Sequence, residues 1–148
     1  MGQTYKIYFD LSGTGWHTNT ESLNAEKITD YTYRLLNTPF YAYEYNFGDI
    51  IEVICSKEGL LFATKMIKRS GHSTFRVFFS EKDEIKNMLV HLKPLLGTGC
   101  NYEHATHSLF AIDVPPETDL EKVIKILKDG EATGVWQYEE GYLHKKNA

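Results

Sequence analysis

The sequence predicts an α+β protein, with an N-terminal small twisted β-sheet or barrel lobe followed by a ferredoxin-like β-α-β-β-α-β unit. Short segments with strand periodicity fill the first half, and two segments with helical periodicity alternate with strands beyond Thr74. The chain has 148 residues, 42% of them hydrophobic, which suits one compact unit. We expect an N-terminal strand and loop over 1–25, an all-β lobe over 26–73 and an α+β lobe over 74–148, with the two lobes sharing one core.

The first half is predicted to be a run of strands and short turns. Residues 5–11 alternate apolar and polar side chains, which is typical of a half-buried strand, and the small polar residues of 12–22 predict a loop. Four further strands follow, over residues 26–36, 40–46, 50–56 and 60–68. Gly48 is expected to take a backbone angle that other residues resist.

The second half is predicted to mix strands with two helices. A strand over 74–80 leads through a capping pair, Ser80 and Asp83, into a helix within 81–97. Residues 100–114 predict two strands, or alternatively one long strand over 104–113. A second capping pair, Thr118 and Glu121, predicts a helix within 118–130 that Gly130 closes, and residues 135–143 form the last strand.

Composition favours a non-secreted, cytoplasmic protein. The N-terminus lacks the charged start and apolar stretch of a signal peptide, no apolar run reaches membrane-spanning length, and the two cysteines are expected to be reduced. Net charge is −4, with seven acids and three bases in residues 1–52 but eight bases and four acids in residues 57–93. This uneven balance gives no overall basic footprint, so no DNA partner is expected.

Several motifs resemble the bacterial domain of unknown function 4265 family. They are the run Asn37 to Phe40, the pair Gly48 and Asp49, the run Ser70 to Arg76, Cys100 with Glu103, Ala111 to Pro115, and Tyr138 to Gly141. They stand in similar order in that family, and the resemblance covers roughly residues 26–143. It implies membership and brings no activity, cofactor or catalytic residue with it.

The segment Ser70 to Arg76 is a candidate anion or ligand site. Its candidate residues are Ser70, Gly71, His72, Ser73 and Arg76. Together they offer an imidazole, hydroxyls, a guanidinium and a glycine that would bring backbone N–H groups close to a phosphate or carboxylate. The alternative interpretation is a tight loop before a central strand, in which the polar groups satisfy the backbone.

No metal, cofactor or catalytic residue is expected. Cys100, His104 and His107 have side chains that suit Zn²⁺, but a structural site needs a fourth ligand, and on a strand the two histidines point to opposite faces. Cys100 and His104 would share a face as a nucleophile pair. Nothing in the sequence supplies the third group that would orient them.

Tyr41, Tyr43 and Tyr45, with Glu44 between them, form a candidate protein interface. If 40–46 is a strand, the three phenols share one face, and aromatic rings of this kind anchor interfaces with little loss of entropy. The alternative is that the rings close the bottom of the β-lobe.

We therefore expect a non-enzymatic protein-binding module, and specifically an immunity-type inhibitor of a basic toxin domain. Small acidic proteins neutralise such domains through complementary charge and aromatic anchors. One alternative is a small enzyme or ligand-binding protein that acts on an anionic substrate at the Ser70 to Arg76 loop. A second is an RNA-binding protein that uses the tyrosines and a basic strip of Lys65, Lys68, Arg69, His72 and Arg76.

Overall fold

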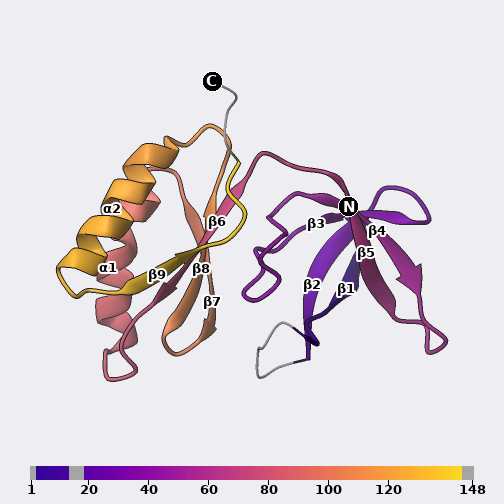
Figure 1. Ribbon diagram of the computed structural model, residues 1–148, viewed down its shortest axis with the longest axis horizontal. Coiled ribbons are helices and arrows are strands. Elements are labelled where there is room, and N and C mark those ends of the chain that lie inside the picture. Colours follow the sequence, from indigo (N-terminus) through magenta and orange to yellow (C-terminus); the bar gives the residue numbers. More distant parts are fainter. Residues whose placement is uncertain (1–2, 14–18, 145–148) are drawn as a thin grey trace. The chain divides into compact units, whose positions relative to one another are not determined.

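The computed structural model describes residues 3–13 and 19–144, which form two compact units, residues 1–72 and residues 73–148. The protein is α+β, with strands in both units and both helices in the second (Figure 1). The middle of the predicted loop over 12–22, residues 14–18, lies outside the described residues. No helix in the described ranges combines the length and the apolar character needed to cross a membrane.

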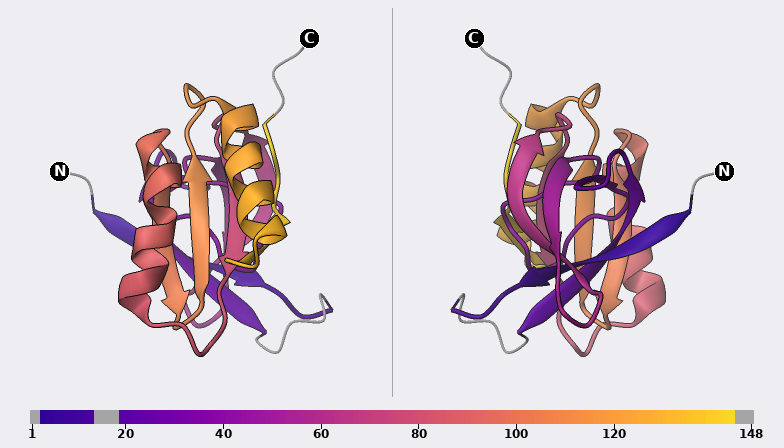
Figure 2. Two further views of the ribbon diagram at one scale, coloured as in Figure 1. Left: turned by 90° about the vertical axis from the view of Figure 1, so that its left-hand side faces the viewer. Right: turned by 90° about the vertical axis from the view of Figure 1, so that its right-hand side faces the viewer.

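The first unit is a closed five-stranded barrel. Its strands are β1 (Thr4–Asp10), β2 (Thr20–Lys27), β3 (Thr32–Leu35), β4 (Ile50–Cys55) and β5 (Leu61–Lys68). Each strand pairs antiparallel with the next, and β5 closes the barrel by pairing parallel with β1 (Figure 2, right). Because side chains alternate along a strand, Ile7 and Phe9 of β1 and Leu23 and Ala25 of β2 point inward, where they are buried.

The barrel begins earlier than the sequence pattern indicates. Strands β1 and β2 fall largely within residues 1–25, which we set apart from the β-lobe, and the predicted single strand over 26–36 is wrong. The chain turns there because the backbone N–H groups of Ile28 and Thr29 both donate to the Thr32 carbonyl, and the Thr29 and Thr32 hydroxyls bond at 2.7 Å.

The predicted strand over 40–46 is also wrong, because its backbone N–H groups are used by other partners. Those of residues 40, 41 and 42 donate to the carboxylate of Glu21. The Tyr45 N–H donates to the Ala42 carbonyl and the Asn46 N–H to the Asp49 carboxylate. The segment is therefore a series of turns without a strand ladder.

The second unit is a four-stranded sheet with two helices. Its elements are β6 (Ser73–Phe78), α1 (Ile85–Gly97), β7 (Asn101–Thr106), β8 (Leu109–Val114), α2 (Leu120–Ala132) and β9 (Gln137–Glu140). The strand order is β7-β8-β6-β9, every neighbouring pair is antiparallel, and both helices cover the same face (Figure 2, left). Residues 101–114 form two strands, as the first interpretation predicts.

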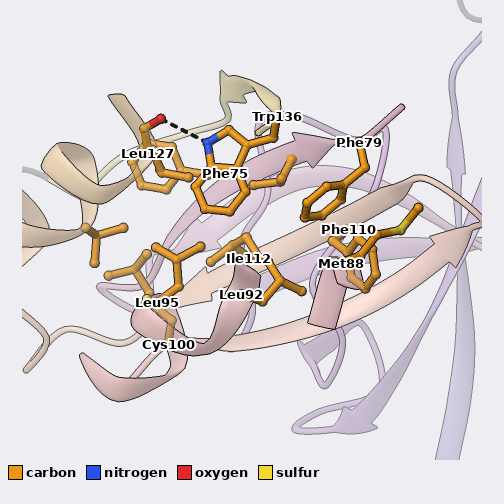
Figure 3. Packing of buried hydrophobic residues seen from close by; sticks show 13 residues of the cluster. Phe75, Phe79, Met88, Leu92, Leu95, Cys100, Phe110, Ile112, Leu127 and Trp136 are labelled. Carbon is orange, nitrogen blue, oxygen red and sulfur yellow. Dashed lines mark hydrogen bonds between the residues drawn. The ribbon is translucent and has the colours of Figure 1, made fainter. Parts of the chain in front are cut away.

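Buried apolar residues form one cluster in each unit, where the sequence predicts a shared core. In the second unit, Phe75, Phe110 and Ile112 of the central strands pack against Leu92 of α1 and Leu127 of α2, all of them fully buried (Figure 3). Alternation along β6 and β8 sends these side chains to the helix side of the sheet.

Both predicted helices form, but their ends differ from the sequence motifs. The N-cap of α1 is Glu84, whose side chain makes no cap hydrogen bond, and that of α2 is Asp119, whose carboxylate accepts from the N–H groups of Glu121 and Lys122. Gly130 lies inside α2 rather than at its end. A Cβ there would lie 2.4 Å from the Trp136 ring, so this glycine serves packing rather than termination.

The two free cysteines are expected to react very differently with thiol reagents. Cys55 is exposed, whereas Cys100 is buried, and this burial raises the pKa of the Cys100 thiol and keeps it protonated, with its Thr98 hydrogen bond only partly opposing the shift. A thiol assay should therefore count one reactive group per folded chain and two after unfolding. Cys55→Ser should leave no fast-reacting thiol, and fast labelling in that variant would contradict the burial of Cys100.

Candidate functional site

A groove of about 530 Å³ lies in the barrel unit and gathers the predicted interface tyrosines. We call it the aromatic groove; its lining is Phe9, Asp10, Leu11, Tyr41, Ala42, Tyr43, Glu44, Tyr45 and Ala63. The C-terminal end of β1, the turns of residues 41–45 and one residue of β5 supply these side chains. The volume lies in the range of ligand-binding pockets.

A buried carboxylate fixes the shape of the tyrosine turns. Glu21 stands at an inward position of β2 and is only 9% exposed. Its two oxygens accept hydrogen bonds from the N–H groups of Phe40, Tyr41 and Ala42, at 2.6, 3.1 and 2.9 Å. Charge-assisted bonds of this kind are stronger than neutral ones, so Glu21 ties the loop to the barrel.

The three tyrosines are not equivalent. Tyr41 and Tyr45 pack against the barrel core, and the Tyr45 ring meets Phe9 edge-on with centroids 4.8 Å apart. Tyr43 is half-buried, lines the groove and is not a member of this core cluster. Of the three groove tyrosines, Tyr43 is therefore the one outside the core cluster of the barrel.

The groove favours positive charge. Hydrogen bonds from the Ser12 hydroxyl and N–H hold the pKa of the exposed Asp10 carboxyl below its usual value, so this group is ionised at neutral pH. Burial, followed by the charge of Glu44, raises the pKa of Tyr45 and keeps its phenol neutral. Among the described residues that line the groove there are two carboxylates and no basic side chain.

A second buried carboxylate, that of Asp49, holds the chain directly after the tyrosine turns. Asp49 is fully buried, and its carboxylate accepts from the N–H groups of Asn46 and Ser70 and lies 3.4 Å from the Arg69 guanidinium. Arg69 also donates to the backbone carbonyl of Glu44. Arg69 therefore anchors the turns, with its charge balanced by Asp49.

The first three residues of the predicted anion site hold their own loop together. The Ser70 hydroxyl donates to the Phe47 carbonyl and accepts from the His72 N–H, and the His72 ring lies 5.2 Å from the Phe47 ring. Gly71 takes a φ of +93°, which provides the turn. These contacts fit the alternative interpretation of a structural loop.

The other two residues of that site lie on opposite faces of β6. The Ser73 hydroxyl accepts from the His144 N–H. Arg76 is three residues further along the strand and is fully buried. Its guanidinium lies against Gly141, in space that a Cβ at residue 141 would occupy. Ser70 and His72 belong to the first unit, whereas Ser73 and Arg76 belong to the second.

The basic strip of the RNA-binding alternative is also divided. Lys65 pairs with Glu52 at 4.0 Å, Arg69 contacts Asp49 and Arg76 is buried. Lys68 remains exposed on β5.

The three residues considered as metal ligands each have a different structural contact. Cys100 is buried, the His104 ring stacks on Phe110 with centroids 4.3 Å apart, and the His107 Nε2 lies 2.7 Å from the Asp83 carbonyl. Over residues 3–13 and 19–144, no three His, Cys, Asp or Glu side chains are grouped to hold a metal ion.

A second groove, of about 680 Å³, lies in the α+β unit. It is lined by four aromatic residues, of which Phe79 and Trp136 are core residues only 5% and 6% exposed and Phe78 and Tyr138 are half-buried, together with the carboxylates of Asp83, Glu131 and Glu139. The aromatic groove of the barrel is the better candidate because its rings belong to a surface loop.

Sequence patterns missed several residues of the aromatic groove. Phe9, Asp10, Leu11 and Ala63 come from strands or strand ends distant in sequence from the tyrosines. Glu21 could have been found from the sequence, because it alternates with Leu23 and Ala25 and so stands on the inward face of the strand, where a charged residue needs hydrogen-bond partners.

Comparisons with known proteins identify a family and a fold. The family model described as "Domain of unknown function (DUF4265)" matches residues 21–138. A solved structure from Neisseria gonorrhoeae, described as a novel crystal structure of a hypothetical protein, is similar with a TM-score of 0.74 and 19% identity, over 99% of this chain and 98% of that one. At this identity the likeness supports the fold alone. The search of curated proteins finds no match.

Proposed function

The chain belongs to the DUF4265 family, and we propose that this member is a non-enzymatic protein-binding module that uses the aromatic groove. The observation that carries the proposal is the convergence of Tyr41, Tyr43 and Tyr45 on one groove, flanked by the carboxylates of Asp10 and Glu44. Tyrosine is enriched among the residues that dominate binding energy, because it offers a large rigid surface and a polar tip.

The partner we propose is a basic protein, and the specific role is that of a cytoplasmic immunity-type inhibitor of a basic toxin domain. Carboxylates at a groove attract a basic surface and speed its encounter, whereas the rings hold the complex once it has formed. The overall charge of −4 also favours a positively charged partner. A toxin gene immediately upstream of the gene for this chain is the genomic arrangement that this role expects.

We also propose a finer description of the fold. The element order β6-α1-β7-β8-α2-β9, with the strand order β7-β8-β6-β9 and antiparallel pairing, supports a ferredoxin-like unit over residues 73–148. The small barrel of the preceding unit then serves as the binding lobe.

Removing the Tyr43 ring should weaken the complex with the product of such a neighbouring toxin gene. We expect Tyr43→Ala to cost about 2 kcal/mol of binding free energy, mainly through faster dissociation. The matched control is Tyr31→Ala, since Tyr31 is a 70% exposed tyrosine of the same barrel that lies outside the groove. Surface plasmon resonance with both variants measures the two rates, and equal effects of the two would contradict the role of the groove.

Removing the charge of Glu44 should instead slow association. We expect Glu44→Gln to reduce the association rate and its dependence on salt, while changing dissociation little. Glu58→Gln removes an exposed acid from the turn between β4 and β5 and is the charge-matched control. The same kinetics at two salt concentrations separate the variants, and a Glu44→Gln association rate equal to that of Glu58→Gln would argue against electrostatic recruitment at the groove.

A further inference from the structure

The aromatic groove combines aromatic side chains with carboxylates, the two elements from which proteins build sites for organic cations. A cation over the face of an aromatic ring is attracted by the ring quadrupole, and more strongly where water is partly excluded. Tyr41, Tyr43 and Tyr45 line the groove and are each half-buried, while Asp10 and Glu44 lie beside them and are exposed.

We propose that the groove takes one organic cation, the guanidinium or ammonium group of an arginine or lysine presented by the partner, between its tyrosine rings and its two carboxylates. This inference rests on the proposed function and names the chemistry that the groove recognises. A guanidinium has the better shape for it, because it is planar and both stacks on rings and bonds to carboxylates.

The charges around the groove support a cation rather than an anion. The backbone N–H groups of residues 40–42 would attract an anion, but they already bind the carboxylate of Glu21. The guanidinium of the neighbouring Arg69 lies 3.4 Å from the buried carboxylate of Asp49, and its effect on the pKa of Tyr45 is smaller than that of burial and of Glu44. The ionised carboxylate of Asp10 would repel an acidic ligand.

The groove is backed by the barrel core. Phe9, which is 3% exposed, lines it and packs in a T-shaped contact with Tyr45, with ring centroids 4.8 Å apart. The groove volume is about 530 Å³. The Glu21 hydrogen bonds hold the backbone of residues 40–42, so this part of the loop is already ordered before a ligand binds, which lowers the entropy cost of binding.

The test uses the full chain and four capped amino acids: N-acetyl methylamides of arginine, lysine, citrulline and norleucine. Citrulline keeps the shape of arginine without its charge, and norleucine keeps the apolar stem of lysine. Nuclear magnetic resonance titrations should show shifts at residues 41–45 and at Asp10 with the two cations. We expect the neutral analogues to bind at least about fivefold more weakly, which is the range of a cation–π contact.

Variants locate the site. Tyr43→Ala and Glu44→Gln should each weaken binding of capped arginine by about fivefold or more. Tyr31→Ala and Glu58→Gln, which change similar side chains of the same unit outside the groove, should leave it unchanged. Citrulline binding as strongly as arginine, or cation-induced shifts confined to residues elsewhere, would overturn the inference.

The titrations also separate this inference from the proposed function. If Tyr43→Ala weakens the protein complex but the groove does not prefer cations, protein binding stands and cation recognition fails. If the groove prefers cations but Tyr43→Ala leaves the protein complex intact, the cation site stands and the proposed function fails.

Discussion

Replacing Glu21 by alanine is expected to lower the free energy of unfolding of the barrel by about 3 kcal/mol, since three N–H groups would lose a charged acceptor and all three hydrogen bonds are at least partly buried. Glu21→Gln keeps one carbonyl oxygen as an acceptor and should cost less. The loss should also loosen the Tyr41 to Tyr45 turns and weaken the aromatic groove.

Hydrogen exchange gives the direct readout of this prediction. In the wild-type protein the amide protons of Phe40, Tyr41 and Ala42 should be protected, and in Glu21→Ala they should exchange at nearly the rate of an open loop. Glu26→Ala is the control, because Glu26 lies on the same strand and forms only a half-exposed ion pair with Arg34, worth about 1 kcal/mol or less. Unchanged protection of residues 40–42 in Glu21→Ala would show that other contacts hold the loop.

Replacing Trp136 by alanine is expected to destabilise the α+β unit by about 4 kcal/mol. The indole is 6% exposed, meets Phe79 edge-on at 5.8 Å and donates from Nε1 to the Leu127 carbonyl at 2.9 Å (Figure 3). Its removal would leave a large cavity beside α2. Chemical denaturation followed by circular dichroism measures the loss.

Gly130 supplies a sharper form of the same test, because two effects of opposite sign compete there. Alanine in a helix is favoured over glycine by about 1 kcal/mol, but its Cβ would stand 2.4 Å from the Trp136 ring. The ring is held by Leu127 and Phe79 and has little room to move, so overpacking of up to about 3 kcal/mol should win. Gly130→Ala should therefore destabilise the wild-type protein and stabilise the Trp136→Ala variant. Stabilisation in both backgrounds would contradict the packing described for Trp136.

Local patterns predicted the elements that make regular hydrogen bonds. The helical repeat of apolar residues over 85–96 marks α1, and Met88 and Leu92 of this repeat are fully buried, as is Leu95, whereas Ile85 and Leu96 are exposed. The strand alternation of residues 5–11 marks β1 in the same way. Capping was less predictable, because Asp119 rather than Thr118 occupies the N-cap of α2 and either residue type suits that position.

Sequence periodicity gave the wrong secondary structure where a side chain distant in sequence binds the backbone N–H groups. Tyr41, Tyr43 and Tyr45 alternate as in a strand, yet the carboxylate of Glu21, some twenty residues away, takes the N–H groups that a strand would need. The tyrosines still meet in one groove, so their choice as a candidate interface agrees with their position, although the geometry that gathers them is a set of turns.

The Ser70 to Arg76 segment stays a predicted ligand site, and its residues also have structural contacts. Its polar residues resemble a ligand site in sequence, but Ser70 bonds to the backbone of residues 47 and 72, and Arg76 enters the interior of its unit. Sequence alone does not distinguish a polar group that faces a ligand from one that satisfies its own chain.

Site-specific photo-crosslinking tests the central claim, that the aromatic groove binds a basic partner, most directly. A benzoylphenylalanine replacing Tyr43 keeps an aromatic ring in the groove, and the same replacement of Tyr31 places the probe on the barrel outside it. After irradiation in the native host, mass spectrometry should find a basic protein attached at position 43, through a peptide that contains arginine or lysine, and absent from position 31. The same products at both positions, or a crosslinked peptide at position 43 without a basic residue, would contradict the account.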